Sequence, residues 1–214
     1  VSGVLNSGRH MVRAGHNAKE ILIPKISVTS LGDYTRNVGY KTGAITYEFE
    51  TKTFNYDRGI RLMADVMDVE EAGVLDCFVE AGSELQRVQV APEADAFTFA
   101  TLAGTEGISI ATPATYSNGE EFLAALLVAK NKMDEDEVPE ENRILYATPT
   151  LINGLMALDT YKSKEVINSF ATVSKVPQSR FYTAINLLDG KTEGEEIGGF
   201  AKAAEGKDIN FMIV

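Results

Sequence analysis

The sequence predicts an α+β protein with an extended hairpin, a long helix and a second half of mixed α and β structure. Apolar and polar residues alternate strictly from Ile45 to Lys52, which is the period of a strand with one face in water. After Glu71, apolar residues recur four and three positions apart, as on one face of a helix. These residues are Val74, Phe78, Ala81, Leu85 and Val88. From residue 117 onward, helical and strand-like patterns alternate along the chain.

The amino-terminal part shows little periodicity. Residues 1–19 mix Gly, Ser, Asn, Arg and both histidines, which predicts an extended or mobile arm. Residues 21–28 are apolar and β-branched, but Pro24 lies among them. Because proline cannot donate to a strand ladder, this segment is predicted to be an edge strand or an extended arm and not a central strand.

The alternating strand is predicted to belong to an extended hairpin. Turn-forming residues occupy 32–34 and 37–40, so residues near 36–41 are the expected partner of the strand at 45–52. An isolated hairpin is marginal in water. The hairpin must therefore lie on its own domain or on a neighbouring subunit, and the pattern alone leaves both options open.

The helix after Glu71 carries Glu80, Glu84 and Arg87 on the side opposite its apolar face. Pro92 is predicted to start a second helical segment, because proline is favoured in the first turn. The only cysteine, Cys77, lies beside the apolar face and is predicted to be a buried small hydrophobe. One cysteine excludes a disulfide within the chain.

The second half predicts a mixed α and β domain. Ser117 and Glu120 have the spacing of a capping box before a helix that ends in the acidic run 134–137. Residues 143–147 predict a short buried strand, followed by Thr148 as N-cap of a helix that begins with Pro149. Residues 170–176 and 181–187 alternate like two strands around residues 177–179, and a short strand is a further option between 104 and 118.

Length, charge and hydropathy disfavour some classes of function. On folding, a 214-residue chain buries roughly 70% of the surface that its unfolded form exposes, which is enough for an ordinary hydrophobic core. The chain has 31 acidic and 20 basic residues, a net charge of −11, which disfavours tight binding to nucleic acid. No run of eighteen apolar residues predicts a membrane span, and no signal peptide is visible. The sequence begins without Met and ends within an apolar run, so we expect it to be a piece of a longer protein.

Motifs for catalysis and metal binding are weak. The acidic run 134–137 lacks the spacing and glycine of an EF-hand, and residues 199–207 lack the spacing of a phosphate loop. The two histidines, His10 and His16, lie in the arm without a zinc or triad pattern. Carboxylates at Asp65, Asp68, Glu70 and Glu71 offer an acid and a base, but Arg58 and Arg61 lie near them and favour an ion-pair network. We therefore expect no enzyme, no cofactor and no metal.

Several short motifs follow one another in a recognisable order. Along the chain these are the turn Ser30-Leu31-Gly32-Asp33-Tyr34, Asp57-Arg58-Gly59, Asp65, Met67-Asp68, Glu71, Leu85-Gln86-Arg87-Val88 and Ala91-Pro92-Glu93-Ala94-Asp95-Ala96-Phe97. A second block comprises Arg143-Ile144-Leu145-Tyr146-Ala147-Thr148-Pro149 and Val176-Pro177 with Ser179-Arg180-Phe181. This order resembles the major capsid proteins of tailed phages and prophages, which have the Hong Kong 97-type fold. The resemblance covers residues 21–214.

The resemblance implies a division of the chain. Residues 1–28 form the N-terminal arm, 29–57 the extended hairpin loop, and 58–116 the peripheral domain, with a spine helix over 70–90. Residues 117–190 form the axial domain. Residues 191–214 form the rest of the axial domain and a return toward the peripheral domain, with the last peripheral strand truncated.

The resemblance also implies that the partner is a second copy of the chain, assembled as hexamers and pentamers of a shell, with scaffolding and portal proteins as further partners. It implies neither sequence-specific nucleic-acid binding nor a membrane. The expected location is the virion capsid, and the host cytoplasm before assembly. The side chains expected at subunit interfaces are Asp33, Tyr34, Arg36, Lys41, Tyr47, Phe49, Asp57, Arg58, Arg61, Asp65, Asp68, Glu71 and Arg87.

The sequence departs from the family pattern at Ile60, Leu62 and Ala72. Lys41 and Lys52 lie in the loop, but neither the asparagine nor the glutamate of the family's crosslink can be matched, so no crosslinking is predicted. Two alternatives stay open. One is the shell protein of a bacterial nanocompartment with the same fold, and the other is a carboxylate-dependent hydrolase.

Overall fold

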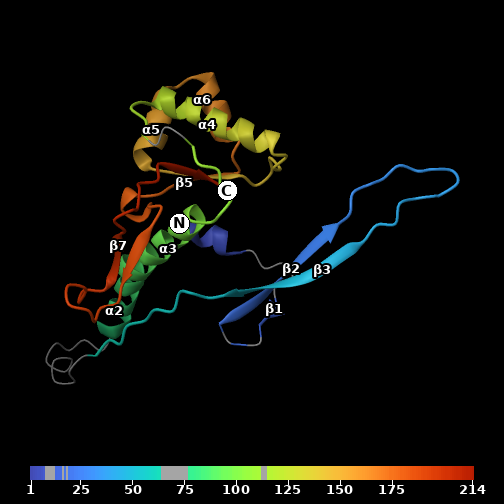
Figure 1. The fold of residues 1–214 in the computed structure, drawn as a ribbon. Coiled ribbons are helices and arrows are strands. Elements are labelled where there is room, and N and C mark those ends of the chain that lie inside the picture. The colour runs from blue at the N-terminus through green and yellow to red at the C-terminus, as the bar shows by residue number, and fades with distance from the viewer. Residues whose placement is uncertain (8–12, 16, 18, 64–76, 112–114) are drawn as a thin grey trace. The chain divides into compact units, whose positions relative to one another are not determined.

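The computed structural model describes residues 1–7, 13–15, 17, 19–63, 77–111 and 115–214 (Figure 1). These residues form helices and three small sheets, which confirms the mixed α and β class. The chain divides into two compact units. Val1–Val4 and Gly73–Val214 make up one, and Leu5–Ala72 make up the other. We call them the main unit and the hairpin unit.

The hairpin unit is built on one long antiparallel pair. Strand β2 (Glu20–Val28) pairs with β3 (Ile45–Thr53) along all nine residues, from Glu20 opposite Thr53 to Val28 opposite Ile45. Figure 1 shows the two strands as a narrow ribbon that ends in a long loop. The strand predicted at 45–52 is confirmed. Its predicted partner near 36–41 is wrong, because those residues belong to the loop between the strands.

β2 is the middle strand of its sheet, contrary to the prediction of an edge strand. The third strand, β1 (Arg13–Ala14), pairs only with Ile21 and Leu22. Because β1 pairs only with Ile21 and Leu22, the edge of β2 that faces β1 has no partner strand at Pro24. The missing N–H of Pro24 is therefore tolerated for the reason that prolines are tolerated on edge strands.

The loop 29–44 closes the ribbon with a turn of its own. Thr35 and Gly39 form an isolated antiparallel bridge, and the Gly39 amide donates to the Thr35 carbonyl at 2.7 Å. Gly39 has a φ of +87°, a left-handed conformation that favours glycine. The rings of Tyr34 and Tyr40 pack beside this turn, 4.9 Å apart.

The chain opens with a short 3-10 helix, η1 (Ser2–Ser7), where the sequence predicted an extended arm. Only the first residues of η1 belong to the main unit, and those from Leu5 onward belong to the hairpin unit. The predicted long helix is described from α2 (Cys77–Leu85) through the π-helical η2 (Gln86–Val90) to α3 (Ala91–Ala103). Leu85 and Val90 keep helical dihedrals, so Pro92 does not break the helix. The wider turn before Pro92 eases the clash between the proline ring and the preceding carbonyls.

The described part of the amphipathic face predicted for this helix is largely open to solvent. Ala81 and Val88 are exposed and Leu85 is half-buried. Val79 and Val90 are exposed as well. The side chain of Cys77, predicted to be buried, lies outside the described set. Burial begins only in α3, where Ala96 and Phe99 are completely buried.

The next helix, α4 (Gly119–Glu135), ends in the predicted acidic run. Its cap lies one residue later than predicted. Asn118 Oδ1 accepts from the Glu121 amide at 2.9 Å, and Glu121 Oε2 accepts from the Ser117 amide at 2.7 Å. This reciprocal pair uses Asn118 and Glu121 in place of Ser117 and Glu120, because asparagine caps a helix as well as serine does.

The core of the main unit lies between α4, α5 (Pro149–Ala157), α6 (Tyr161–Asn168) and a three-stranded sheet. The sheet orders β5 (Thr172–Lys175), β4 (Ile144–Ala147) and β8 (Phe211–Ile213), with β4 parallel to β5 and antiparallel to β8. The strand near 143–147 and the helix starting at Pro149 are confirmed, although the Thr148 side chain makes no capping bond. The buried core residues are Phe122, Leu123, Leu126, Leu145, Ala147, Ile152, Leu155, Val166 and Phe170.

Helices α4 and α5 approach closely at a pair of glycines. A Cβ placed on Gly119 would lie 2.4 Å from the Gly154 carbonyl oxygen. Only glycine at 119 allows the two backbones to come this near. Figure 1 shows α4, α5 and α6 gathered together at one end of the main unit.

The remaining strands form a separate ladder, in which β6 (Ile185–Leu188) pairs antiparallel with β7 (Gly199–Lys202). The two strands predicted around residues 177–179 exist in shorter form as β5 and β6, but they belong to different sheets. The 3-10 helix η3 (Gln178–Arg180) separates them. Residues 104–111 and 115–118 contain no strand, and α6 was not predicted.

Candidate functional site: the exposed ribbon and the Asp95 anchor

We call strands β2 and β3 with their loop 29–44 the ribbon. Residues opposite one another in an antiparallel pair share a face, so the register assigns every ribbon side chain to one of two faces. One face is almost entirely apolar, and the five of its side chains nearest the loop are 40–75% exposed. This apolar face comprises Leu22, Pro24, Ile26, Val28, Ile45, Tyr47, Phe49 and Thr51.

The other face of the ribbon is mostly polar. It pairs Ser27 with Thr46, Lys25 with Glu48 and Ile21 with Lys52. Lys52 Nζ lies 2.5 Å from Glu50 Oε1, and the positive charge and hydrogen bond of Lys52 lower the pKa of that carboxyl. The ribbon therefore has one wet face, as the alternation predicts, but its apolar face is also open to solvent in the single chain.

The predicted interface residues of the ribbon fall into two groups. Tyr47 and Phe49 lie on the apolar face with their rings 5.1 Å apart, and the Arg13 guanidinium lies 5.4 Å from the Phe49 ring centre. The structure thus brings these aromatic residues together. Asp33, Tyr34, Arg36 and Lys41 are spread along the loop 29–44, and all four are exposed.

Beyond the ribbon, the Asp57-Arg58-Gly59 segment is tied back to the strands. Lys19 Nζ donates to Asp57 Oδ2 at 2.7 Å, and this bond lowers the pKa of the Asp57 carboxyl. Asp57 thus pairs with a lysine 38 positions away. The predicted network of Arg58 and Arg61 with the carboxylates at 65–71 stays a prediction, because those carboxylates lie outside the described residues. Arg58 and Arg61 are exposed.

Four of the carboxylates considered for chemistry, Asp65, Asp68, Glu70 and Glu71, lie outside the described residues. Arg87, in η2, pairs with Glu84 one turn earlier at 2.7 Å. This is a contact within an exposed helix, and the predicted interface role of Arg87 stays a prediction.

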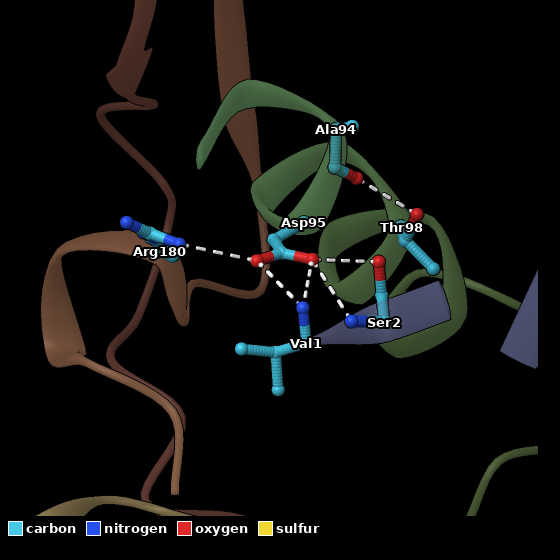
Figure 2. Close-up of polar contacts among 6 residues, drawn as sticks. All are labelled: Val1, Ser2, Ala94, Asp95, Thr98 and Arg180. Atoms are coloured by element: carbon cyan, nitrogen blue, oxygen red, sulfur yellow. Dashed lines mark hydrogen bonds and ion pairs between the residues drawn. The ribbon is translucent and has the colours of Figure 1, made fainter. Parts of the chain in front are cut away.

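A second cluster surrounds Asp95 on α3, where three segments of the main unit meet (Figure 2). The Asp95 side chain is 5% exposed. Its Oδ1 accepts from the Ser2 amide at 2.9 Å and from Ser2 Oγ at 2.8 Å. Its Oδ2 lies 3.3 Å from Arg180 Nη1 on η3, and the Val1 nitrogen lies 3.1 Å from Oδ1. Asp95 therefore joins η1, α3 and η3.

The environment of Asp95 predicts that the stability of the fold depends on pH. Burial raises the pKa of the Asp95 carboxyl, but the hydrogen bonds that it accepts, first of all from the Ser2 amide and hydroxyl, outweigh burial, so the pKa is lower than usual. A carboxyl with a depressed folded-state pKa stabilises the fold above its unfolded pKa of about 3.9 and loses that contribution as pH falls through the folded value.

We therefore expect Asp95→Asn to lower the stability of the chain by about 1 to 3 kcal/mol at pH 6. The difference from the wild type should shrink as the pH falls from about 6 toward 2. Urea unfolding at a series of pH values measures both chains. A difference that stays constant over this range would show that the charge of Asp95 contributes no stability.

No separate pattern in the sequence indicated the Asp95 cluster. Asp95 and Arg180 stood within family-like motifs, but their contact joins positions 85 residues apart. Ser2 lies 93 residues from Asp95. The ion pair of the buried Arg143 with Asp134 was also not predicted, because Asp134 belongs to an acidic run whose pattern indicates a solvated helix end.

Other kinds of site find little support in the described part of the chain. Those residues contain no group of three or more His, Cys, Asp or Glu side chains arranged to hold a metal ion. None of the described helices combines the length and hydropathy needed to cross a membrane.

Comparison with known proteins gives a likeness of fold. No family model and no curated protein matches the sequence. The structure is similar to a solved chain from Mycobacterium phage Che8, with a TM-score of 0.50 and 16% sequence identity. The match covers 65% of this chain and 50% of that chain, so the present chain spans about half the length of its structural neighbour. At this identity, the comparison shows a shared fold.

Proposed function

We propose that the chain is a structural subunit of a phage or prophage head, a major capsid protein of the Hong Kong 97 type that assembles with copies of itself around a DNA genome. The observation that carries the proposal is the apolar face of the ribbon. Monomeric proteins rarely leave a contiguous apolar surface of this kind uncovered. An exposed strand pair also promotes aggregation unless something covers it.

The free energy gained by burying the apolar face favours an interface over a bare surface. Burying one large apolar side chain contributes about 1.5 to 3 kcal/mol. Ile26, Val28, Ile45, Tyr47 and Phe49 are each 40–75% exposed, so much of this free energy is still available to a partner surface. The surplus over the cost of association appears as affinity. A ribbon that lies on a neighbouring copy would bury this surface in every subunit of a closed shell.

Charge allows a contact between unlike surfaces of two copies. The ribbon, residues 20–53, contains four Lys and Arg against four Asp and Glu, whereas residues 73–214 contain 11 against 22. A ribbon without net charge is not repelled by the acidic main unit of another copy, whereas two acidic main units repel each other. Contacts between unlike surfaces of two copies generate rings and shells.

The fold likeness favours a phage origin over the nanocompartment alternative. The solved neighbour comes from a phage, and the motif order described above resembles phage and prophage capsid proteins. The carboxylates that a hydrolase would need lie outside the described residues. The choice of a structural protein over a hydrolase therefore rests on the exposed ribbon and on the fold likeness.

Imaging of the purified full-length product tests the proposal. We expect light scattering to detect capsomers or shells, and negative-stain electron microscopy to show closed particles. A full-length product that stays monomeric at high protein concentration would contradict the proposal. Particles that co-purify with an enzyme as cargo would favour the nanocompartment, and loss of a hydrolytic activity in Asp65→Asn would favour the hydrolase.

A further inference from the structure

Two asparagines of the chain are followed directly by glycine, and the structure brings these two pairs together. Asn118 precedes α4, and Asn153 lies in α5. Their glycines, Gly119 and Gly154, are the residues at which the two helix backbones approach each other. Because glycine has no Cβ to shield its amide nitrogen, an asparagine before glycine is open to attack by that nitrogen. The local fold then determines which of the two pairs reacts.

The reaction is deamidation through a cyclic imide. The amide nitrogen of the glycine attacks the side-chain carbonyl carbon of the asparagine. The side-chain nitrogen leaves as ammonia and takes the proton of the glycine amide. Water then adds to one of the two imide carbonyls and opens the ring. One opening yields aspartate, and the other yields isoaspartate, in which the backbone runs through the side chain and is longer by one atom.

The backbone nitrogen of Gly119 is not engaged in a helical ladder. Gly119 is the first residue of α4, and the amides that open a helix have no acceptor within it. Asn118 is exposed and has an extended backbone, so water reaches its side chain. Its Oδ1 accepts an exposed hydrogen bond from the Glu121 amide. Opening this cap bond allows the side chain to turn toward the glycine nitrogen.

The backbone nitrogen of Gly154 is protected by the helix. Gly154 lies inside α5, where its amide donates to the carbonyl one turn earlier. Attack by this nitrogen requires the helix to open at that bond first. The Asn153 side chain also accepts a hydrogen bond, from Lys175 Nζ at 2.8 Å. Both asparagine side chains thus accept a bond, and the two sites differ in the state of the glycine nitrogen.

We propose that Asn118 is a site of spontaneous deamidation in the folded chain and that Asn153 is not. Aspartate at position 118 caps a helix as well as asparagine does, and its charge is favoured at the start of α4. Isoaspartate lengthens the backbone directly before Gly119, where an added Cβ would lie 2.4 Å from the Gly154 carbonyl oxygen. The isoaspartate form therefore disturbs the contact of α4 with α5, and the aspartate form keeps it. This modification does not depend on the shell function proposed above.

Peptide mapping by mass spectrometry measures both sites in one sample of the full chain, incubated at mildly alkaline pH. In the folded chain we expect Asn118 to deamidate about tenfold faster than Asn153, the factor that corresponds to about 1.4 kcal/mol of free energy for opening the helix. In urea both glycine nitrogens are exposed. The two sites should then deamidate at similar rates, because glycine follows both asparagines.

The unfolded chain is thus the matched control for the folded one. Deamidation of Asn118 that is no faster than that of Asn153 in the folded chain would overturn the proposal. The same tenfold ratio in urea would overturn it too, because the difference would then come from the neighbouring sequence and not from the fold. Asn118→Ser identifies the modified peptide, because serine keeps the cap but has no side-chain amide to lose.

Discussion

Replacing Arg143 by alanine is expected to lower the stability of the main unit by about 3 kcal/mol. The Arg143 side chain is 3% exposed, and its Nη1 lies 2.6 Å from Asp134 Oδ1 as an ion pair without hydrogen-bond geometry. Nη2 and Nε donate to the carbonyls of Val138 and Pro139 at 2.5 and 3.0 Å. One guanidinium thus holds the end of α4 and the turn after it against the start of β4.

The estimate lies at the low end of the cost of breaking a buried ion pair, because Asp134 is 39% exposed and water can reach it. The two carbonyls, in contrast, lose their donors within a turn that has no regular ladder. Urea unfolding followed by far-ultraviolet circular dichroism measures the change, and the signal suits a chain that contains no tryptophan.

Two control variants separate charge from geometry. Arg143→Lys keeps the charge but loses the planar fork, so it should recover only part of the stability. Lys164→Ala removes a lysine that pairs with Asp159 on the surface, where both side chains are mostly exposed, and it should have little effect. If Arg143→Ala were no less stable than Lys164→Ala, the buried guanidinium would not support the turn.

Local patterns predicted the elements whose signals lie within a few neighbouring residues. The alternation at 45–52 and the proline at position 149 gave β3 and the start of α5 correctly. The strand that pairs with β3 could not be predicted, because the alternation at 45–52 is compatible with any neighbouring strand as partner. β3 pairs with Glu20–Val28 across a sixteen-residue loop, and this pairing puts Ile26 and Val28 on the face of Tyr47.

The candidate site shows the same limit. Tyr47 and Phe49 could be named from the alternation, since a strand with apolar residues on one face must present them to something. The contacts of Asp95 could not be predicted in this way, because its partners Arg180 and Ser2 lie 85 and 93 positions away and are common residue types. Hydrogen bonds between distant segments depend on the packed fold, and the sequence around Ser2 indicated only an irregular arm.

The largest effect on assembly is expected from the ribbon. The double substitution Ile26→Thr and Ile45→Thr should abolish particles and leave subunits or small oligomers. Both side chains are exposed on the apolar face, at 57% and 75%. Losing the transfer free energy of two such side chains weakens each contact by about 2 to 4 kcal/mol, or roughly thirtyfold to a thousandfold. Threonine keeps the β-branched shape, so the strand pair itself should persist.

A second double variant tests whether the effect belongs to the apolar face. Lys25 and Glu48 lie opposite each other on the polar face, and changing both to threonine leaves the net charge of the ribbon unchanged. This variant should still assemble. Light scattering and negative-stain microscopy compare the two variants, with circular dichroism to check that each is folded. Particles formed equally well by both would mean that the apolar face is not what joins one copy to the next. Loss of particles only in the Lys25 and Glu48 variant would place the contact on the opposite side of the ribbon.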